Sequence, residues 1–302
     1  MSVLKRFAAP GAAIAMALAA LAAGCGGGGS GPEVDLPRIV NGPTSGGVSS
    51  AAATISWTTD RACDSRVNYG KTTSYTDSLV AGDLVNAHTL RITGLAESTR
   101  YHYRVTSRDQ EGQAAVSGDF GFTTLSLAGQ LVGEGWEAFE TGAWEASLAK
   151  FQQARAASPN GVPALEGLGW ALLRLYRLEE SLGFLAQALA IQPSRADCLA
   201  AATLVGGALG RCGDTLTRGR QLLALAGDAY VFSHDQSVGA PDIRYCLVIC
   251  LMAAGDLEGA LAEAEAIDPS IDLDPGDRST WGDHATFEDA LLALVEDLGS
   301  RV

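Results

Sequence analysis

Residues 129–193 read GQLVGEGWEAFETGAWEASLAKFQQARAASPNGVPALEGLGWALLRLYRLEESLGFLAQALAIQP. Apolar residues recur in this stretch with the 3.6-residue period of a helix and not with the two-residue period of a strand. Five residue types also return after 34 positions: Gly135 and Gly169, Trp136 and Trp170, Ser147 and Ser181, Ala154 and Ala188, and Pro159 and Pro193. A fixed period of this length predicts a repeat of paired helices.

The segments Gly129–Pro159 and Pro163–Pro193 resemble tetratricopeptide repeats, in which two antiparallel helices pack through small residues and a proline follows the second helix. The resemblance places small residues at helix contacts and a large core residue in each second helix: Gly135, Gly169, Ala154 and Ala188, with Phe151 and Leu185. The chain departs from the family pattern at positions that usually hold Trp, Tyr and Ala: Leu131 and Leu165, Ala138 and Leu172, and Ser147 and Ser181.

Beyond Pro193 the register breaks, but helical periodicity continues. It predicts a third hairpin over 199–210 and 215–225, a fourth over 243–253 and 257–267, and a final helix over 286–298 that caps the stack. The connector between the third and fourth hairpins is long, and residues 232–242 of it carry a His234-Asp235 pair. Long connectors in compact arrays usually have a function, although the sequence does not show which one.

Residues 51–124 follow a different pattern, with short runs of alternating polar and apolar residues bounded by turn residues. Such runs predict an antiparallel β-sandwich. Trp57, the run from Leu95 through Thr99, Tyr101 and Tyr103, and the closing Phe-Gly-Phe-Thr-Thr of 120–124 resemble a fibronectin type III domain. The resemblance implies that the Tyr101 phenol bonds a backbone group upstream. For function it implies a rigid spacer more than a ligand site.

The first 24 residues carry Lys5 and Arg6 ahead of an apolar run, and small residues precede Cys25. This resembles a bacterial lipoprotein signal peptide, which implies cleavage before Cys25 and a lipid on its thiol. The alternative is an uncleaved membrane anchor. We therefore expect four parts: a signal peptide over 1–24, the lipidated cysteine with a glycine-rich tether over 25–37, a fibronectin type III-like domain over 38–124, and a tetratricopeptide-like domain over 129–302.

The acidic balance limits the partners of the chain. The whole sequence has 21 Lys and Arg against 35 Asp and Glu, a formal net charge of −14. Such a surface repels phosphate backbones and anionic headgroups, so we expect no nucleic acid partner and attachment to the membrane through the lipid alone.

The repeat pattern nominates a partner-binding surface. In tetratricopeptide repeats the ninth position faces the groove, and Trp136 and Trp170 fall there. Phe139 lies one turn onward in the first repeat, Arg174 is near the same face in the second, and Tyr245 would come from the fourth hairpin. Aromatic residues and Arg dominate interface hot spots, so we predict a groove for a protein or peptide. The competing interpretation, of equal weight, is that both indoles pack internally.

The sequence offers no catalytic or metal motif. After lipidation of Cys25 five cysteines remain, which favours buried thiols over a metal site, while a bridge between Cys212 and Cys246 or Cys250 stays possible. The aspartates at 268, 272, 274, 277 and 283 depart from a calcium loop and indicate a solvated acidic loop. We expect no cofactor.

The combined prediction is a multidomain chain, an all-β fibronectin type III-like sandwich followed by an all-α tetratricopeptide-like solenoid. We expect a non-catalytic scaffold, lipid-anchored in a bacterial envelope outside the cytoplasmic membrane. Gly26 after the cysteine favours the outer membrane in a two-membrane organism. The alternative is a carbohydrate or cell-wall accessory protein whose sandwich binds glycan. An enzyme with a pocket near His234, Asp235 and Asp242 is a third possibility.

Overall fold

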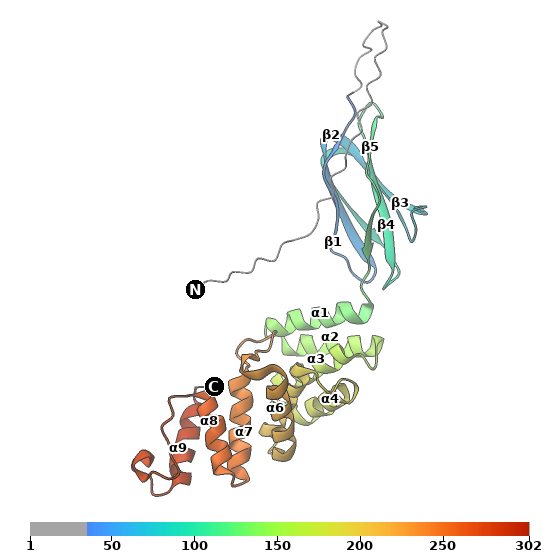
Figure 1. Ribbon diagram of the computed structural model, residues 1–302. Helices are drawn as coiled ribbons and strands as arrows, with labels where there is room; N and C mark the ends of the chain where they lie inside the picture. Colours follow the sequence, from blue (N-terminus) through green and yellow to red (C-terminus); the bar gives the residue numbers. More distant parts are fainter. Residues whose placement is uncertain (1–34, 302) are drawn as a thin grey trace, which may run out of the picture. The chain divides into compact units, whose positions relative to one another are not determined.

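The structure is a computed structural model that describes residues 35–301. The predicted signal peptide and Cys25, and the tether up to residue 34, lie outside the described residues. Within 35–301, strands come first and helices follow, as the two periodicities predict (Figure 1). In this part of the chain no helix has both the length and the apolar character needed to span a membrane.

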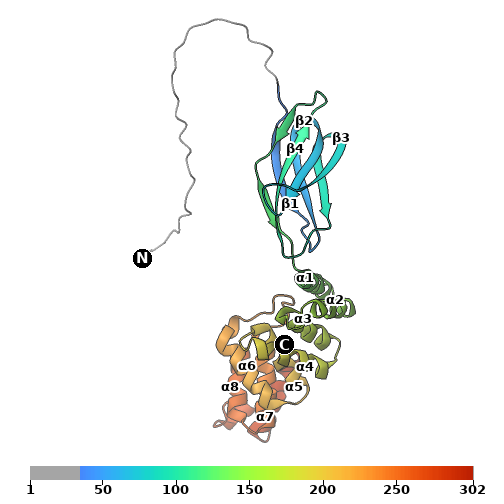
Figure 2. The same ribbon diagram turned by 90° about the vertical axis from the view of Figure 1, so that its right-hand side faces the viewer.

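The sandwich is built around one long central strand. Its strands are β1 (Ile39–Gly46), β2 (Ala52–Gly70), β3 (Asp77–Thr93), β4 (Arg100–Arg108), β5 (Ala114–Val116) and β6 (Phe120–Thr123). The first half of β2 pairs with β1 and β3, and its second half pairs with β3 and β4. Because β2 changes partners along its length, the antiparallel strands wrap round one apolar core (Figure 2).

The core of the sandwich contains the residues that carried its sequence signal. Trp57, Tyr101 and Tyr103 are buried, and the indole Nε1 of Trp57 donates to Ser107 Oγ at 2.9 Å. The phenol oxygen of Tyr101 accepts a hydrogen bond from the backbone N–H of Ala96 at 3.0 Å. The expected bond between this tyrosine and an upstream backbone group is thus confirmed.

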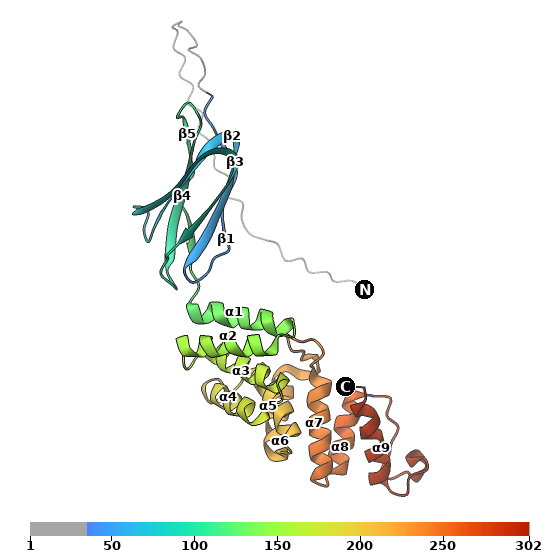
Figure 3. The same cartoon turned by 180° about the vertical axis from the view of Figure 1, so that it is seen from behind.

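The helical part is a series of antiparallel pairs, each packed against the next (Figure 3). The helices are α1 (Leu127–Glu140), α2 (Trp144–Ala157), α3 (Val162–Arg174), α4 (Leu178–Ile191), α5 (Ala196–Ala208), α6 (Cys212–Ala226), α7 (Ala240–Ala253), α8 (Leu257–Ile267) and α9 (Phe287–Gly299). Two short 3₁₀ turns, η1 (Gly227–Ala229) and η2 (Arg278–Trp281), lie in the connectors. The predicted helices are all present.

Glycines at the predicted small positions allow the helices to approach closely. A Cβ at Gly135 would lie 2.6 Å from the ring of Phe151, and one at Gly169 would lie 2.4 Å from Leu185. Gly167, which the repeat pattern did not single out, is tighter still, with 2.2 Å to the same ring of Phe151. Real Cβ contacts are not this short, so each position excludes any larger side chain unless its neighbour moves.

The last helix covers the end of the series, as expected of a capping element. The Thr286 hydroxyl accepts from the Asp289 N–H and so caps the start of α9. Leu291, Val295 and Leu298 of α9 are buried against apolar residues of α7 and α8.

A candidate binding face filled by a loop of the same chain

Four of the five predicted partner-binding residues come together in space. Trp136 and Phe139 of α1 have ring centroids 5.4 Å apart, and the ring centroid of Phe139 lies 6.5 Å from that of Trp170 on α3. Arg174, one turn beyond Trp170 on α3, borders the same surface. We call these four residues the aromatic face.

Tyr245 does not belong to the aromatic face, which corrects the sequence-based expectation. It lies on α7 and packs against the apolar cluster formed by α7, α8 and α9. Its hydroxyl approaches the backbone of Gly299 so closely that a Cβ there would lie 2.1 Å away. The final helix therefore takes the place that a partner would need in order to contact Tyr245.

The aromatic face is not open in this structure. Phe139 and Trp170 are both 0% exposed, and Trp136 and Arg174 are half-buried. The expectation that all four side chains contact a partner therefore fails for Phe139 and Trp170 in this conformation. The cover is the connector between α6 and α7, which runs back to the first two hairpins (Figures 1 and 3). We call residues 230–239 of this connector the 230–239 loop.

The 230–239 loop has its own short-range structure. Val231 and Gly239 form an antiparallel bridge, and the Phe232 N–H donates to the Val238 carbonyl at 2.9 Å. At the tip, Asp235 Oδ1 accepts from the Ser237 N–H at 3.1 Å and from its hydroxyl at 2.6 Å. An Asp that bonds the backbone two residues on is a common turn former. The loop is thus a small hairpin that presents its side chains to the face.

Two ring stacks hold the loop on the face. The ring of Phe232, itself 0% exposed, lies parallel to Trp170, with 3.8 Å between centroids and 8° between planes. The imidazole of His234 lies flat on Trp136, with 4.0 Å between centroids and 1° between planes. His234 Nδ1 also lies 2.7 Å from Glu140 Oε1. Stacked aromatic pairs add stability beyond the area that they bury.

An ion pair completes the contact. The Asp235 carboxylate pairs with the Arg174 guanidinium, and both side chains are partly buried. Burial alone would raise the pKa of Asp235, but the hydrogen bonds from Ser237 and the charge of Arg174 outweigh it and hold the pKa below its ordinary value. Asp235 therefore stays charged on the face at neutral pH.

The base of the loop is fixed by a buried polar cluster between α3 and α5. The Tyr230 hydroxyl lies 3.0 Å from Asp197 Oδ1, and Trp170 Nε1 donates to the Asp197 carbonyl at 3.2 Å. Next to them Glu166, 2% exposed, accepts from Arg195 Nε at 2.6 Å. Burial outweighs this partner and raises the pKa of Glu166 to about 7.

A cavity of about 260 Å³ remains open beside the loop. Its lining comes from α3, α5, the loop and α7, namely Trp170, Leu173, Arg174, Tyr176, Leu204, Val238 and Asp242. Tyr176 at its rim is 88% exposed.

Tyr176 also has an unusual backbone. Its φ is +56°, in the left-handed region, and the positions 34 residues before and after it are Gly142 at +78° and Gly210 at +68°. A non-glycine residue pays a steric cost there, of about 1 kcal/mol. The same 34-residue register marks Tyr176 as the hairpin turn residue that is not glycine, a signal the sequence analysis missed.

The acidic and imidazole groups of the connector do not form a catalytic set. His234 is engaged by Trp136 and Glu140, whereas Asp235 is engaged by Arg174. Asp242 caps α7 by accepting from the Gly239 N–H at 2.8 Å. Each group is directed to a different neighbour, so the geometry does not support a shared proton.

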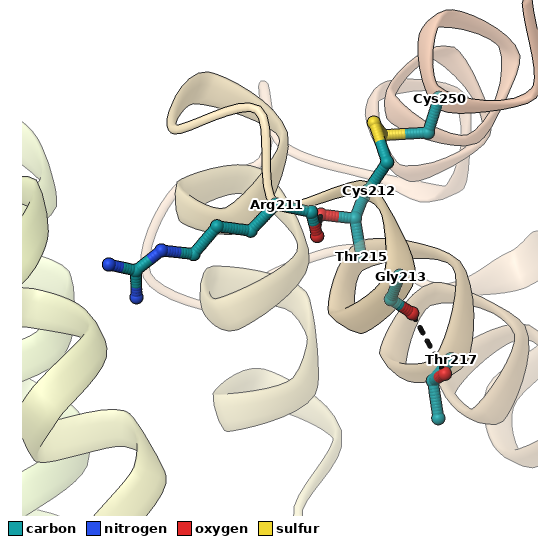
Figure 4. The surroundings of a disulfide bond; sticks show 6 residues. All are labelled: Arg211, Cys212, Gly213, Thr215, Thr217 and Cys250. Atoms are coloured by element: carbon teal, nitrogen blue, oxygen red, sulfur yellow. Dashed lines mark hydrogen bonds between the residues drawn. A yellow bond between two sulfur atoms is a disulfide. The ribbon is translucent and has the colours of Figure 1, made fainter. Parts of the chain in front are cut away.

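The cysteines are divided between one disulfide and three thiols. Cys212 at the start of α6 is bonded to Cys250 of α7, the possibility that the sequence left open for Cys212 (Figure 4). The neighbouring Arg211 side chain points away from the bridge (Figure 4) and pairs with Glu179 of α4. Cys63 and Cys198 are buried and Cys246 is half-buried. Among residues 35–301 no three His, Cys, Asp or Glu side chains gather to hold a metal.

The sandwich offers little aromatic surface for a sugar. Of the aromatic residues described over 35–124, only Phe120 is exposed, at 39%. Trp57 is buried in the core. This distribution does not favour glycan binding by the sandwich.

Comparison with known proteins agrees with the two-part fold. Residues 43–124 match the family described as "Purple acid Phosphatase, N-terminal domain", a match confined to the sandwich. No curated protein matches the chain in sequence.

Solved structures resemble the helical part. "Crystal structure of MamA protein" is 12% identical with a TM-score of 0.44 and covers 58% of this chain and 93% of that one. A thermophilic TPR protein from Thermus thermophilus, TTC0263, is 22% identical with a TM-score of 0.37 over 55% and 81%. The first TPR of Spaghetti (RPAP3), solved with an HSP90 peptide, is 15% identical with a TM-score of 0.37 over 43% and 94%. At these identities the likeness concerns the fold alone.

Proposed function

We propose that this chain is a non-catalytic binding protein of a bacterial envelope, anchored by a lipid on Cys25, that holds a partner protein on the aromatic face and the adjoining cavity. The observation that carries the proposal is the seating of the 230–239 loop. Two ring stacks and one ion pair hold an irregular segment of chain against α1 and α3. Helical arrays of this type commonly bind peptides through such surfaces.

The disulfide supports the extracytoplasmic part of the proposal. A bond between Cys212 and Cys250 persists in oxidising compartments and is rare in the cytosol of ordinary bacteria. The leader sequence before Cys25 leads to the same compartment.

Tyr176 is the residue through which a partner can first make contact. It is exposed, it borders the open cavity, and it occupies a turn where glycine would relieve backbone strain. Tyr is also among the residues that most often dominate binding energy. A partner that contacts Tyr176 and enters the cavity does not need to move the loop first.

A substitution at Tyr176 tests this function without disturbing the fold. Tyr176→Gly removes the side chain and relaxes the turn, so the free energy of unfolding should stay constant or rise by up to about 1 kcal/mol. Partner capture should fall about tenfold if Tyr176 contributes as a hot spot. The measurement is chemical crosslinking of the full chain in its native membrane, followed by quantification of the attached protein.

Ile191→Ala provides the matched control, because Ile191 is an exposed apolar residue at the end of α4, away from the cavity lining. Capture by this variant should equal that of the native chain. If Tyr176→Gly captures as much partner as Ile191→Ala does, the cavity is not the contact site. If neither the native chain nor any variant captures a protein, the scaffold function is refuted.

A further inference from the structure

The 230–239 loop describes the ligand that the aromatic face is shaped to hold. We infer that the face accepts, from the partner protein, an extended segment with an aromatic ring, one spacer residue, a second flat ring such as imidazole, and a carboxylate immediately after it. We infer also that the loop competes with that segment for the same seat. This inference rests on the proposed function and specifies the chemistry of the partner.

Each position of the loop sets one requirement. Phe232 fills the space over Trp170 and is completely buried, so this position demands an aromatic ring of similar size. Ser233 is exposed, and so the spacer is unrestricted. His234 needs a flat ring to stack on Trp136.

The fourth position requires a negative charge. Asp235 pairs with Arg174, whose guanidinium also lies 5.8 Å from the ring of Trp144. The Nε of Arg174 is buried and has no hydrogen-bond partner among the described residues. Removing the carboxylate without a replacement would leave a partly buried cation unpaired, which is costly. A ligand that displaces the loop must therefore bring its own carboxylate.

The way in which the loop is attached makes replacement by another chain feasible. Its backbone hydrogen bonds join residues of the loop and its immediate flanks, such as Phe232 with Val238 and Tyr230 with Ala240. Its attachment to α1 and α3 consists of side-chain contacts, and these can be reproduced by a segment of a second protein. Val238 and Trp170 both line the open cavity, so an incoming segment can begin at that edge.

Covalent linkage gives the loop an advantage over a short free peptide. A tethered segment acts at an effective concentration on the order of millimolar, so a free peptide of equal intrinsic affinity is largely excluded. A partner must supply further contacts, at Tyr176 for example, to prevail over the loop. Weakening the loop should therefore increase the binding of a short peptide that carries the same side chains.

The test uses a labelled synthetic peptide with the sequence of residues 230–240, YVFSHDQSVGA, and the full chain purified in detergent. Phe232→Ala empties the seat over Trp170. A double variant, His234→Ala with Asp235→Asn, loosens the loop and leaves the buried core intact. Ser233→Ala is the matched control, since it alters an exposed residue of the same loop. Fluorescence anisotropy reports binding, and circular dichroism confirms that each variant is folded.

We expect both loosened variants to bind the peptide about tenfold or more tightly than the native chain and Ser233→Ala do. A peptide in which the Phe is replaced by Ala should bind about tenfold more weakly than the parent peptide. Equal binding of the two peptides would overturn the inference, as would a lack of increased binding in every folded variant. If Phe232→Ala does not fold, the double variant decides.

Partner capture separates this inference from the function on which it rests. A native chain that captures a protein, together with loosened variants that do not bind the peptide, retains the scaffold function and refutes the ligand assignment. Peptide binding without any captured partner supports the seat and refutes the scaffold function.

Discussion

Substitution of Phe232 by alanine is the strongest perturbation of the loop. The Phe232 side chain is fully buried, with its ring centroid 3.8 Å from that of Trp170 and 6.0 Å from that of Phe139. Replacement of a buried Phe by Ala costs about 3–5 kcal/mol through lost burial and the cavity left behind. The loop has one solvent-facing side and can relax into part of that space, so we expect about 3 kcal/mol, the lower end of that range. A protein of ordinary stability, about 5–15 kcal/mol, would remain folded.

The assay is urea denaturation at about 25 °C, monitored by helical circular dichroism and by tryptophan fluorescence. In the native baseline, Phe232→Ala should shift tryptophan emission to the red and increase quenching by acrylamide, because water gains access to Trp170. Ser233→Ala should stay within about 0.5 kcal/mol of the native chain, as exposed substitutions usually do. A loss below about 1 kcal/mol for Phe232→Ala, with unchanged quenching, would refute the claim that the ring is seated on the face.

Three further predictions follow from buried features of the helical part. Burial raises the pKa of Glu166 to about 7 in the folded protein, so its effect favours folding at low pH and is lost as pH rises from 4.5 through 7; the stability advantage of Glu166→Gln over the native chain should grow by up to about 3 kcal/mol between about pH 4 and pH 8, and parallel pH profiles would contradict this. Replacing Cys212 and Cys250 together by Ala should cost about 2–4 kcal/mol in denaturation without reductant, and reductant should then destabilise the native chain but not the variant. Gly167→Ala should cost about 1–3 kcal/mol because its Cβ would overlap a phenyl ring of α2, whereas Gly183→Ala, whose Cβ meets nothing within 4 Å, should stabilise by about 0.5–1 kcal/mol; similar melting temperatures for these two variants would exclude the close packing described.

Local periodicity predicted the two-part fold because it depends on neighbours along the chain. The 34-residue register located the helical pairs, and it identified Gly135 and Gly169 as close-contact positions. The same register extends to Gly142, Tyr176 and Gly210, so the strained turn at Tyr176 was within reach of the sequence. Its exposure at a cavity was not, because the cavity is formed by segments distant in sequence.

The contents of the aromatic face could not be predicted from the repeat pattern. The pattern states which positions face the groove, but it carries no information on what fills that groove. Phe232 and His234 reach Trp170 and Trp136 across 62 and 98 residues of chain, and such contacts leave no periodic signal. A family resemblance derived from uninterrupted repeats does not include this connector.

The disulfide was underdetermined for a similar reason. Cys246 and Cys250 lie one turn apart on the same helix, so both were candidates for Cys212. Only the rotation of α7 against α6 selects Cys250, while Cys246 packs near Gly207 of α5. Helix rotation at this level is set by tertiary packing and is not visible in residue spacing.

Site-specific photo-crosslinking tests the central claim most directly. A photoreactive residue would replace Tyr176 in one chain and Ile191 in another, each expressed in its native membrane, and the adducts would be compared after illumination. We expect one protein attached at position 176 and absent at position 191, with the adduct reduced by excess YVFSHDQSVGA peptide when the loop carries Phe232→Ala. Equal adducts at the two positions, or none at position 176 while a partner is retained elsewhere on the chain, would contradict the assignment of the binding face.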